Sequence, residues 1–597
     1  MPPSRLGRIP PGLIYLSKQI PRILAPAASC YLARIILYRF CDIAIPTWLA
    51  VLAYIFSGPL VLTVFVQYYI WKDRREASAA GAVLAPNLPG WIGGLDLFTV
   101  NVENMFPGDH LAVGAAELGY TFGLRFLFKT RLFTAEPDHL RVILATEFNS
   151  FEKGPEFRDA HEPLLGTGVF AADGEMWKFH RQMTRPFFHR ERISDFDLFE
   201  SLADKAVTQI KARLREGYPV DMQDMVARFT LDAATSFMFA RDMQSIAAPM
   251  PYPHYVPSST TATATIKPHA VAAAFRDAQL VTASRYRLGE HWPLSEFWKD
   301  ELTGPVKIIH EYLDPILEEA IAKKRAEERE GKGKTADEAA QEGQTLLDHL
   351  LTFTEDRTIL RDEILSISVA GRDTTASLLS FTLYMLSQNP HILSKLRSEI
   401  LRIVGPSRRP TFADFRDLKY LRAVLNETLR LYPAVPLNAR TPLYPTVLQP
   451  KNGGRPIYIP AGTRTLVNKI VMHRRTDLWG PDALTYDPDR FLDERLHKYL
   501  IPNPFIFLPF SAGPRICLGQ QFAYHEASFF LVALLQTFSA ISLSAEAQPP
   551  AARPPAEWKT NDKSGWKAHE KIRPRAHMTM FVRGGLWVTM EEAEKDV

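Results

Sequence analysis

The feature that most constrains this chain is a single cysteine, Cys517, in the loop-like segment Phe510–Gly519. An apolar stretch follows directly and predicts a helix over Gln521–Phe538. The positive end of a helix dipole and free backbone N–H groups stabilise a thiolate at such a place. Gly513 permits a turn with positive φ, and Gly519 permits a close backbone approach. No second Cys or His stands at zinc-ligand spacing, so the loop favours a single thiolate ligand to a haem iron over a zinc site.

The residues around Cys517 narrow its interpretation further. An isolated cysteine is most often a buried structural side chain. The pattern F-x-x-G-x-R-x-C-x-G, met by Phe510, Gly513, Arg515, Cys517 and Gly519, resembles the haem-binding signature of the cytochrome P450 superfamily. This resemblance implies that Cys517 is the axial ligand of the iron of haem b, and that the other four residues belong to the cofactor site.

A second motif lies inside a long apolar helix predicted for Arg361–Gln388. The segment Ala370–Thr375 places a glycine, an acid and two hydroxyls in mid-helix, where they weaken an ordinary core helix. Taken alone, it is equally compatible with a polar stripe at a helix crossing. The pattern A-G-x-[DE]-T-T resembles the oxygen-binding helix of the same superfamily. That resemblance implies that Asp373 and Thr374 form an acid–alcohol pair that supplies protons during O2 activation.

Two weaker motifs extend the resemblance. Glu427 and Arg430 stand three residues apart on a predicted helix, a spacing too common to be a signal by itself. Further on, the segment Y-D-P-D-R-F contributes Arg490. The resemblance implies that Glu427, Arg430 and Arg490 form a buried charge network that holds the cysteine loop in place.

The two propionates of a haem need cationic hydrogen-bond donors, and arginine suits carboxylates best. Trp177 and Arg181 match the pattern W-x-x-x-R, and Arg440 and Arg515 are the other two candidates. Each arginine taken alone reads as an ordinary surface side chain. Their order around the stronger motifs is what points to the cofactor.

The N-terminal region differs from the rest of the chain. Residues 43–71 carry no charge and are nearly all apolar. This run is longer than the roughly 20 residues that a helix needs to span a bilayer. Gly58–Pro59 predicts a kink within this run. A buried core helix is the alternative interpretation, whereas a cleavable signal peptide is disfavoured because residues 1–42 precede the run. Residues 20–40 are compatible with either an interfacial helix or a second membrane contact.

We therefore predict four regions: an N-terminal, membrane-interfacial segment (1–42), a transmembrane helix (43–71), a linker rich in Ala, Pro and Gly (72–94) and a haem-thiolate monooxygenase domain (95–597). The basic residues that follow the span weakly favour a catalytic domain on the cytosolic side of the endoplasmic reticulum membrane. Ala247–Pro268 and Lys323–Gln344 resemble surface insertions.

The expected fold class is α+β and predominantly helical, with the cytochrome P450 fold behind an N-terminal transmembrane anchor. Periodicity predicts helices over Ile193–Glu216, Met225–Phe239, Pro305–Glu330, Arg361–Gln388 and Leu418–Leu431, and strands over Arg455–Ile459, Thr463–Ile470, His577–Val582 and Leu586–Met590.

Composition restricts the partners. A net charge of +4 gives no reason to expect nucleic acid, and three cysteines exclude a disulfide framework. The chain has no G-x-G-x-x-G fingerprint, so electrons from NADPH need a separate reductase: NADPH–cytochrome P450 reductase, with cytochrome b5 as a further candidate. Lys178, Arg185 and Arg190 are candidates for docking it.

The anchor, the linker and the motif A-G-R-D-T-T-A resemble fungal membrane-bound alkane and fatty-acid hydroxylases. This implies hydroxylation of C–H bonds in long-chain, small apolar substrates that can arrive from membrane lipid. One alternative is a broad xenobiotic oxidase of alkylphenols or polycyclic aromatics. A peroxide-using or isomerising enzyme is disfavoured by Asp373 and Thr374. A non-catalytic membrane haem protein is a distant alternative, and it would consume no NADPH.

Overall fold

The computed structural model of this chain describes residues 9–98, 105–188, 196–241, 243–257, 267–330, 345–450 and 453–594. The docking candidate Arg190 and parts of the two predicted insertions, 258–266 and 331–344, lie outside the described residues.

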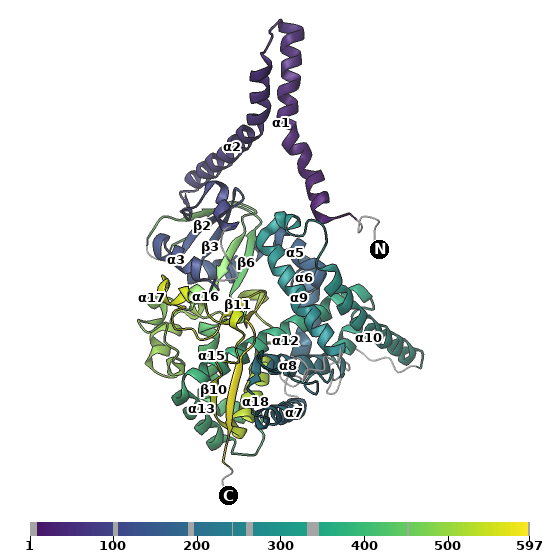
Figure 1. Cartoon of the computed structure of the whole chain (residues 1–597), viewed down its shortest axis with the longest axis vertical. Helices are drawn as coiled ribbons and strands as arrows, with labels where there is room; N and C mark the ends of the chain where they lie inside the picture. The colour runs from purple at the N-terminus through teal and green to yellow at the C-terminus, as the bar shows by residue number, and fades with distance from the viewer. Residues whose placement is uncertain are drawn as a thin grey trace.

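Helices make up most of the domain, as the periodicity predicts (Figure 1). The longer ones are α3 (Asp109–Leu118), α5 (Pro155–Leu165), α6 (Gly174–Thr184), α7 (Phe196–Arg215), α8 (Met222–Phe239), α9 (Lys267–Leu288), α10 (Thr303–Arg329), α12 (Arg357–Gln388), α13 (Pro390–Ile403), α15 (Lys419–Leu431) and α18 (Gln520–Thr537). The short ones include α11 (Leu346–Leu351), α16 (Lys469–Met472) and α17 (Thr476–Trp479).

The core is built around α12, which runs through the domain and packs against α8 and α18. Its C-terminal half contributes fully buried side chains such as Phe381, Leu383 and Leu386. These meet the apolar faces of α13, α15 and α18 in the largest hydrophobic cluster. A helix that is apolar all round is expected to be enclosed by others, and α18, whose side chains from Phe522 to Gln536 are nearly all buried, fits this rule.

Small sheets lie beside the helices. A five-stranded sheet has the order β2-β3-β9-β6-β4, formed by Thr121–Phe126, Lys129–Thr134, Thr465–Asn468, Leu437–Pro442 and Phe151–Glu152. A three-stranded sheet has the order β10-β13-β5, formed by Phe538–Leu543, Trp587–Glu592 and Val220–Asp221. A second three-stranded sheet has the order β1-β8-β7, formed by Val83–Leu84, Ile457–Ile459 and Thr446–Leu448. A two-stranded sheet pairs β11 (Pro574–Ala576) with β12 (Met580–Val582).

Two predicted elements end earlier than their apolar patterns suggest. The strand predicted to reach Ile470 stops at Asn468, because the Asn468 side chain accepts a hydrogen bond from the backbone N–H of Val471 and caps α16. The helix predicted to reach Phe538 stops at Thr537, where Phe538 becomes extended and pairs with Glu592 of β13.

Two long helices precede the domain and form a hairpin. Figure 1 shows α1 (Pro11–Cys41) and α2 (Thr47–Ala79) rising from one end of the domain and meeting at their far ends. Both are long and apolar enough to cross a membrane. Two features therefore differ from the boundaries expected from sequence: residues 11–41 form a helix of their own, and α2 continues beyond Trp71.

Both helices of the hairpin contact the domain at their near ends. The backbone N–H of Gly12 donates to the carbonyl of Phe297 at 3.0 Å, and a Cβ at Gly12 would collide with the Phe297 ring. At the end of α2, the hydroxyl of Tyr458 donates to Glu76 at 2.7 Å. The segment predicted as a linker thus continues α2 to Ala79 and then pairs with β8 through β1.

Candidate functional site

The loop that carries Cys517 is held by a tight turn. Ser511 and Gly513 both have positive φ, and the backbone N–H of Cys517 donates to the carbonyl of Phe510 at 3.0 Å. A Cβ on Gly513 would lie 1.8 Å from the carbonyl oxygen of Leu144, so only glycine fits there. At Gly519 an added Cβ would meet nothing closer than Phe188 at 3.8 Å. Protein packing alone therefore does not require that glycine.

Cys517 has a shifted pKa and an exposed surface. Burial raises its pKa, and the backbone N–H of Gly519 and the charges of Arg181 and Lys469 partly offset this effect. The residue nevertheless keeps exposed surface, so the surrounding protein does not cover it completely.

A cluster of buried cations lies beside this loop. Arg440 is 2% exposed and Arg515 stacks over the ring of Trp177, with its Cζ at 4.7 Å from the centroid. Arg515 also donates to Asp173 at 2.8 Å, and Arg181 donates to the carbonyl of Ile516 at 2.8 Å. The structure thus places all four predicted propionate donors around one region.

These cations have unsatisfied donors. Burial lowers the pKa of Arg440 and of Arg515 to about 10, and for Arg515 the charge of Arg440 adds to this. Among the described residues, Arg440 Nε and Arg515 Nη1 are buried and have no hydrogen-bond partner. Buried guanidinium donors need carboxylate acceptors, and the propionates of a haem supply two of them.

The predicted charge network is completely buried. Arg430 forms a two-pronged ion pair with Glu427, at 2.6 Å and 2.8 Å, and both side chains have no exposed surface. Arg490 approaches Glu427 at 3.5 Å and also pairs with Asp482 at 2.9 Å. The network reaches the cysteine loop through His473, whose carbonyl accepts from Arg430 and whose Nε2 accepts from the backbone N–H of Leu508.

The predicted acid and alcohol lie next to each other on α12, with separate partners. Thr374 Oγ1 donates to the carbonyl of Ala370 at 2.6 Å, a back-bond that competes with the regular helix ladder. Asp373 instead accepts from Gln279 Nε2 at 2.5 Å and approaches Arg372 at 3.4 Å. A Cβ on Gly371 would meet only Ala234 at 3.8 Å, so packing does not demand this glycine either.

Sequence reasoning missed several buried polar residues near these motifs. Lys153 and Lys469 belong to the cation cluster, and burial lowers the pKa of Lys469 to about 8. Glu526 on α18 is 1% exposed, and burial raises its pKa to about 8. Gln279 is fully buried on α9. The sequence around Lys153 contains no recognisable motif. It therefore gives no indication that this lysine is buried in the cation cluster.

Together these residues fit a haem. The exposed Cys517, the free buried donors of Arg440 and Arg515, and the open space around Gly519 all agree with a cofactor bound at the cysteine loop. When bound through a thiolate, haem supplies O–O bond cleavage.

Comparisons with known proteins agree with this geometry. The family model described as Cytochrome P450 matches residues 86–563. Cytochrome P450 monooxygenase himC of Aspergillus japonicus is 36% identical over 73% of this chain and 73% of its own length. Cytochrome P450 52A3-A of Candida maltosa is 36% identical over 70% of this chain and 77% of its own length. Cytochrome P450 52A1 of Candida tropicalis is 37% identical over 70% of this chain and 74% of its own length.

The predicted fold class, the haem cofactor and the monooxygenase chemistry are confirmed. The enzyme uses O2 and electrons from NADPH that a reductase delivers, and its apolar N-terminal helices attach it to a membrane. The chain belongs to the cytochrome P450 family.

Proposed function

We propose that this enzyme hydroxylates long-chain apolar substrates, alkanes and fatty acids, near one end of the chain. The observation that carries this proposal is the docking of both apolar helices on the catalytic domain. Gly12 and Tyr15 of α1 contact the segment that follows α9, so one end of the hairpin adjoins a helix that reaches Asp373. A substrate dissolved in the bilayer would meet the domain at this end.

We assign the residue roles as follows. Cys517 would hold the haem iron through its thiolate. Trp177, Arg181, Arg440 and Arg515 hold the propionates, while Phe510, Gly513 and Gly519 shape the loop. The network of Glu427, Arg430 and Arg490 keeps the loop in register. Asp373 and Thr374 hold and pass the proton that O2 reduction consumes.

The overall reaction balances with these groups. One oxygen atom enters a C–H bond of the substrate, and the other leaves as water after taking up two electrons from NADPH and two protons from solvent. We place the enzyme in the endoplasmic reticulum membrane with its catalytic domain in the cytosol. NADPH–cytochrome P450 reductase is the proposed electron donor, and cytochrome b5 a further partner. Lys178 and Arg185 are basic residues that would suit an acidic docking face.

The test is a turnover assay in membranes with added reductase and NADPH. Dodecane, dodecanoic acid, an alkylphenol and a fused-ring aromatic are offered together, and products are identified by mass spectrometry. We expect terminal or near-terminal hydroxylation of the two chains. Cys517→Ala should abolish both the product and the thiolate-type spectrum of the reduced carbon monoxide complex.

Cys30→Ala and Cys41→Ala are matched controls, because both cysteines belong to the N-terminal segment that precedes α2. Product from the aromatics alone would replace this proposal by a xenobiotic oxidase. Haem binding without NADPH consumption would support a carrier instead. A thiolate spectrum that survives in Cys517→Ala would remove Cys517 from its role.

A further inference from the structure

The contact between α9 and α12 contains a polar pair that the proposed reaction does not yet use. Gln279 has no exposed surface, and its Nε2 donates to Asp373 Oδ2 at 2.5 Å. Arg372, the preceding residue on α12, approaches the other carboxylate oxygen at 3.4 Å. Asp373 is therefore held toward α9, while Thr374 bonds back to Ala370 on its own helix. Neighbouring residues on a helix point about 100° apart, so the two side chains occupy different faces of α12.

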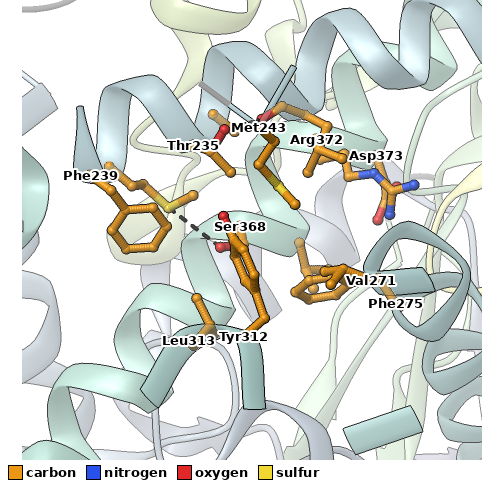
Figure 2. Close-up of a pocket in the computed structure, with 14 residues that line it drawn as sticks. Thr235, Phe239, Met243, Val271, Phe275, Tyr312, Leu313, Ser368, Arg372 and Asp373 are labelled. Atoms are coloured by element: carbon orange, nitrogen blue, oxygen red, sulfur yellow. Dashed lines mark hydrogen bonds and ion pairs between the residues drawn. The ribbon is translucent and has the colours of Figure 1, made fainter. Parts of the chain in front are cut away.

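The face that Asp373 occupies borders a narrow pocket, distinct from the residues around Cys517. Figure 2 shows Asp373 and Arg372 at its edge, opposite Val271 and Phe275 of α9 and Tyr312 of α10. Most of its lining is apolar, contributed by α8, α9, α10 and α12, and Cys517 does not belong to it. Arg372 and Asp373 are the charged residues of this lining, so a water molecule held in the pocket would lie beside them.

Three buried polar atoms near Asp373 make no hydrogen bond among the described residues. These are Gln279 Oε1, Arg372 Nε and Arg372 Nη1, the last of which only approaches Asp373 Oδ1 at 3.4 Å. Buried polar atoms without a partner destabilise a fold, and ordered water usually satisfies them. Water at these positions would connect Gln279 and Asp373 to the pocket side of α12.

We propose that Gln279 is the positioning residue for Asp373, and that protons reach Asp373 from the α9 side of α12. This inference rests on the role proposed above for Asp373. The ionised carboxylate, held by the Gln279 amide, takes a proton from water on this face. It then turns toward Thr374, gives that proton to the reduction of O2 and returns to Gln279 as the anion. The proton comes from solvent and the electrons from NADPH, so no further reactant is needed.

Gln279→Met tests the proposal in the membrane-bound holoenzyme with its reductase. Methionine keeps the length of the side chain and removes the donor. We expect the fraction of NADPH recovered as hydroxylated product to fall about tenfold, with a matching rise in hydrogen peroxide and a larger solvent deuterium isotope effect on product formation. The thiolate-type carbon monoxide spectrum should be unchanged.

Thr282→Val is the matched control, because Thr282 is fully buried one turn further along α9 and no hydrogen bond joins it to Asp373 within the described chain. A double-mutant cycle adds Asp373→Asn. It measures the coupling of NADPH consumption to product formation, together with thermal unfolding. We expect Gln279→Met to have no further effect on coupling in that background. Wild-type coupling in Gln279→Met, or additive effects in the cycle, would overturn the role of Gln279 alone. Wild-type coupling in Asp373→Asn would overturn the role of Asp373 and this inference with it.

Discussion

Arg430 shows how much one buried side chain contributes to this fold. Its guanidinium makes two bonds to Glu427 and further bonds to the carbonyls of His473 and Ala483. We predict that Arg430→Leu lowers the free energy of unfolding by about 3–5 kcal/mol, because the carboxylate of Glu427 stays buried without its main partner. Urea unfolding followed by tryptophan fluorescence, together with haem content, measures this.

The control for Arg430→Leu is Lys307→Leu on α10. Lys307 pairs with Glu311 at 3.7 Å, and both side chains are largely exposed. Exposed pairs contribute little, so the unfolding midpoint should not move. Equal losses in the two variants would mean that burial does not set the strength of the Glu427–Arg430 pair.

At this same scale, sequence reasoning named Cys517, Glu427, Arg430 and Arg490 because each stands in a short motif whose spacing is local. The direction of the Asp373 side chain could not be predicted. Its partner Gln279 comes from a helix 94 residues away in sequence, and only the packing of α9 on α12 brings the two together. Lys153 and Lys469 were missed for the same reason, since a buried cation is recognised by its neighbours and not by its own position in the chain.

At the scale of elements, the hairpin of α1 and α2 makes a prediction about topology. Gly12 and Tyr15, in the first turns of α1, contact Phe297 and His291 of the domain, so the start of α1 lies on the domain's side of the hairpin. We predict that α1 and α2 both cross the membrane. A tag at the N-terminus and a tag at the C-terminus should then both be digested by protease added outside sealed microsomes.

A tag inserted between Cys41 and Thr47, at the far end of the hairpin, is the internal control and should be protected. Protection of the N-terminal tag would mean that only α2 crosses. The apolar run 43–71 predicted α2 well, because a charge-free stretch of that length has few alternatives. Residues 20–40 gave an ambiguous pattern, because scattered arginines and two prolines interrupt it. In the structure they belong to α1, which packs against α2.

The same contrast holds for strands. The strands predicted over Arg455–Ile459 and Leu586–Met590 are short apolar runs, and the structure contains β8 and β13 there, with bounds shifted by one or two residues. The hairpin of β2 and β3 was not predicted. Phe122 and Phe133 face each other across it, but Gly123, Arg125 and Arg131 break the alternation in the sequence. Its stability comes from the parallel pairing of β3 with β9, more than 300 residues later in the chain.

At the scale of the whole molecule, Glu526 links stability to pH. It is buried on α18, close to Thr375 of α12, and burial raises its pKa from 4.5 to about 8. The folded enzyme therefore binds a proton that the unfolded chain releases above pH 4.5. Stability from this group is complete below that pH and is lost as pH rises through about 8. The carboxylate is costly to ionise there because it lies between two core helices.

We predict that the melting temperature of the wild-type holoenzyme falls between pH 5 and pH 8, and that Glu526→Gln makes this fall shallower by the linkage of about one proton. Glutamine keeps the shape of the protonated acid and cannot ionise. Glu311→Gln, at an exposed position on α10, should leave the slope as in the wild type. Thermal melts followed by circular dichroism across that range distinguish the variants. Parallel curves for Glu526→Gln and wild type would show that Glu526 already ionises in the folded enzyme, and that the helices α12 and α18 leave room for water around it.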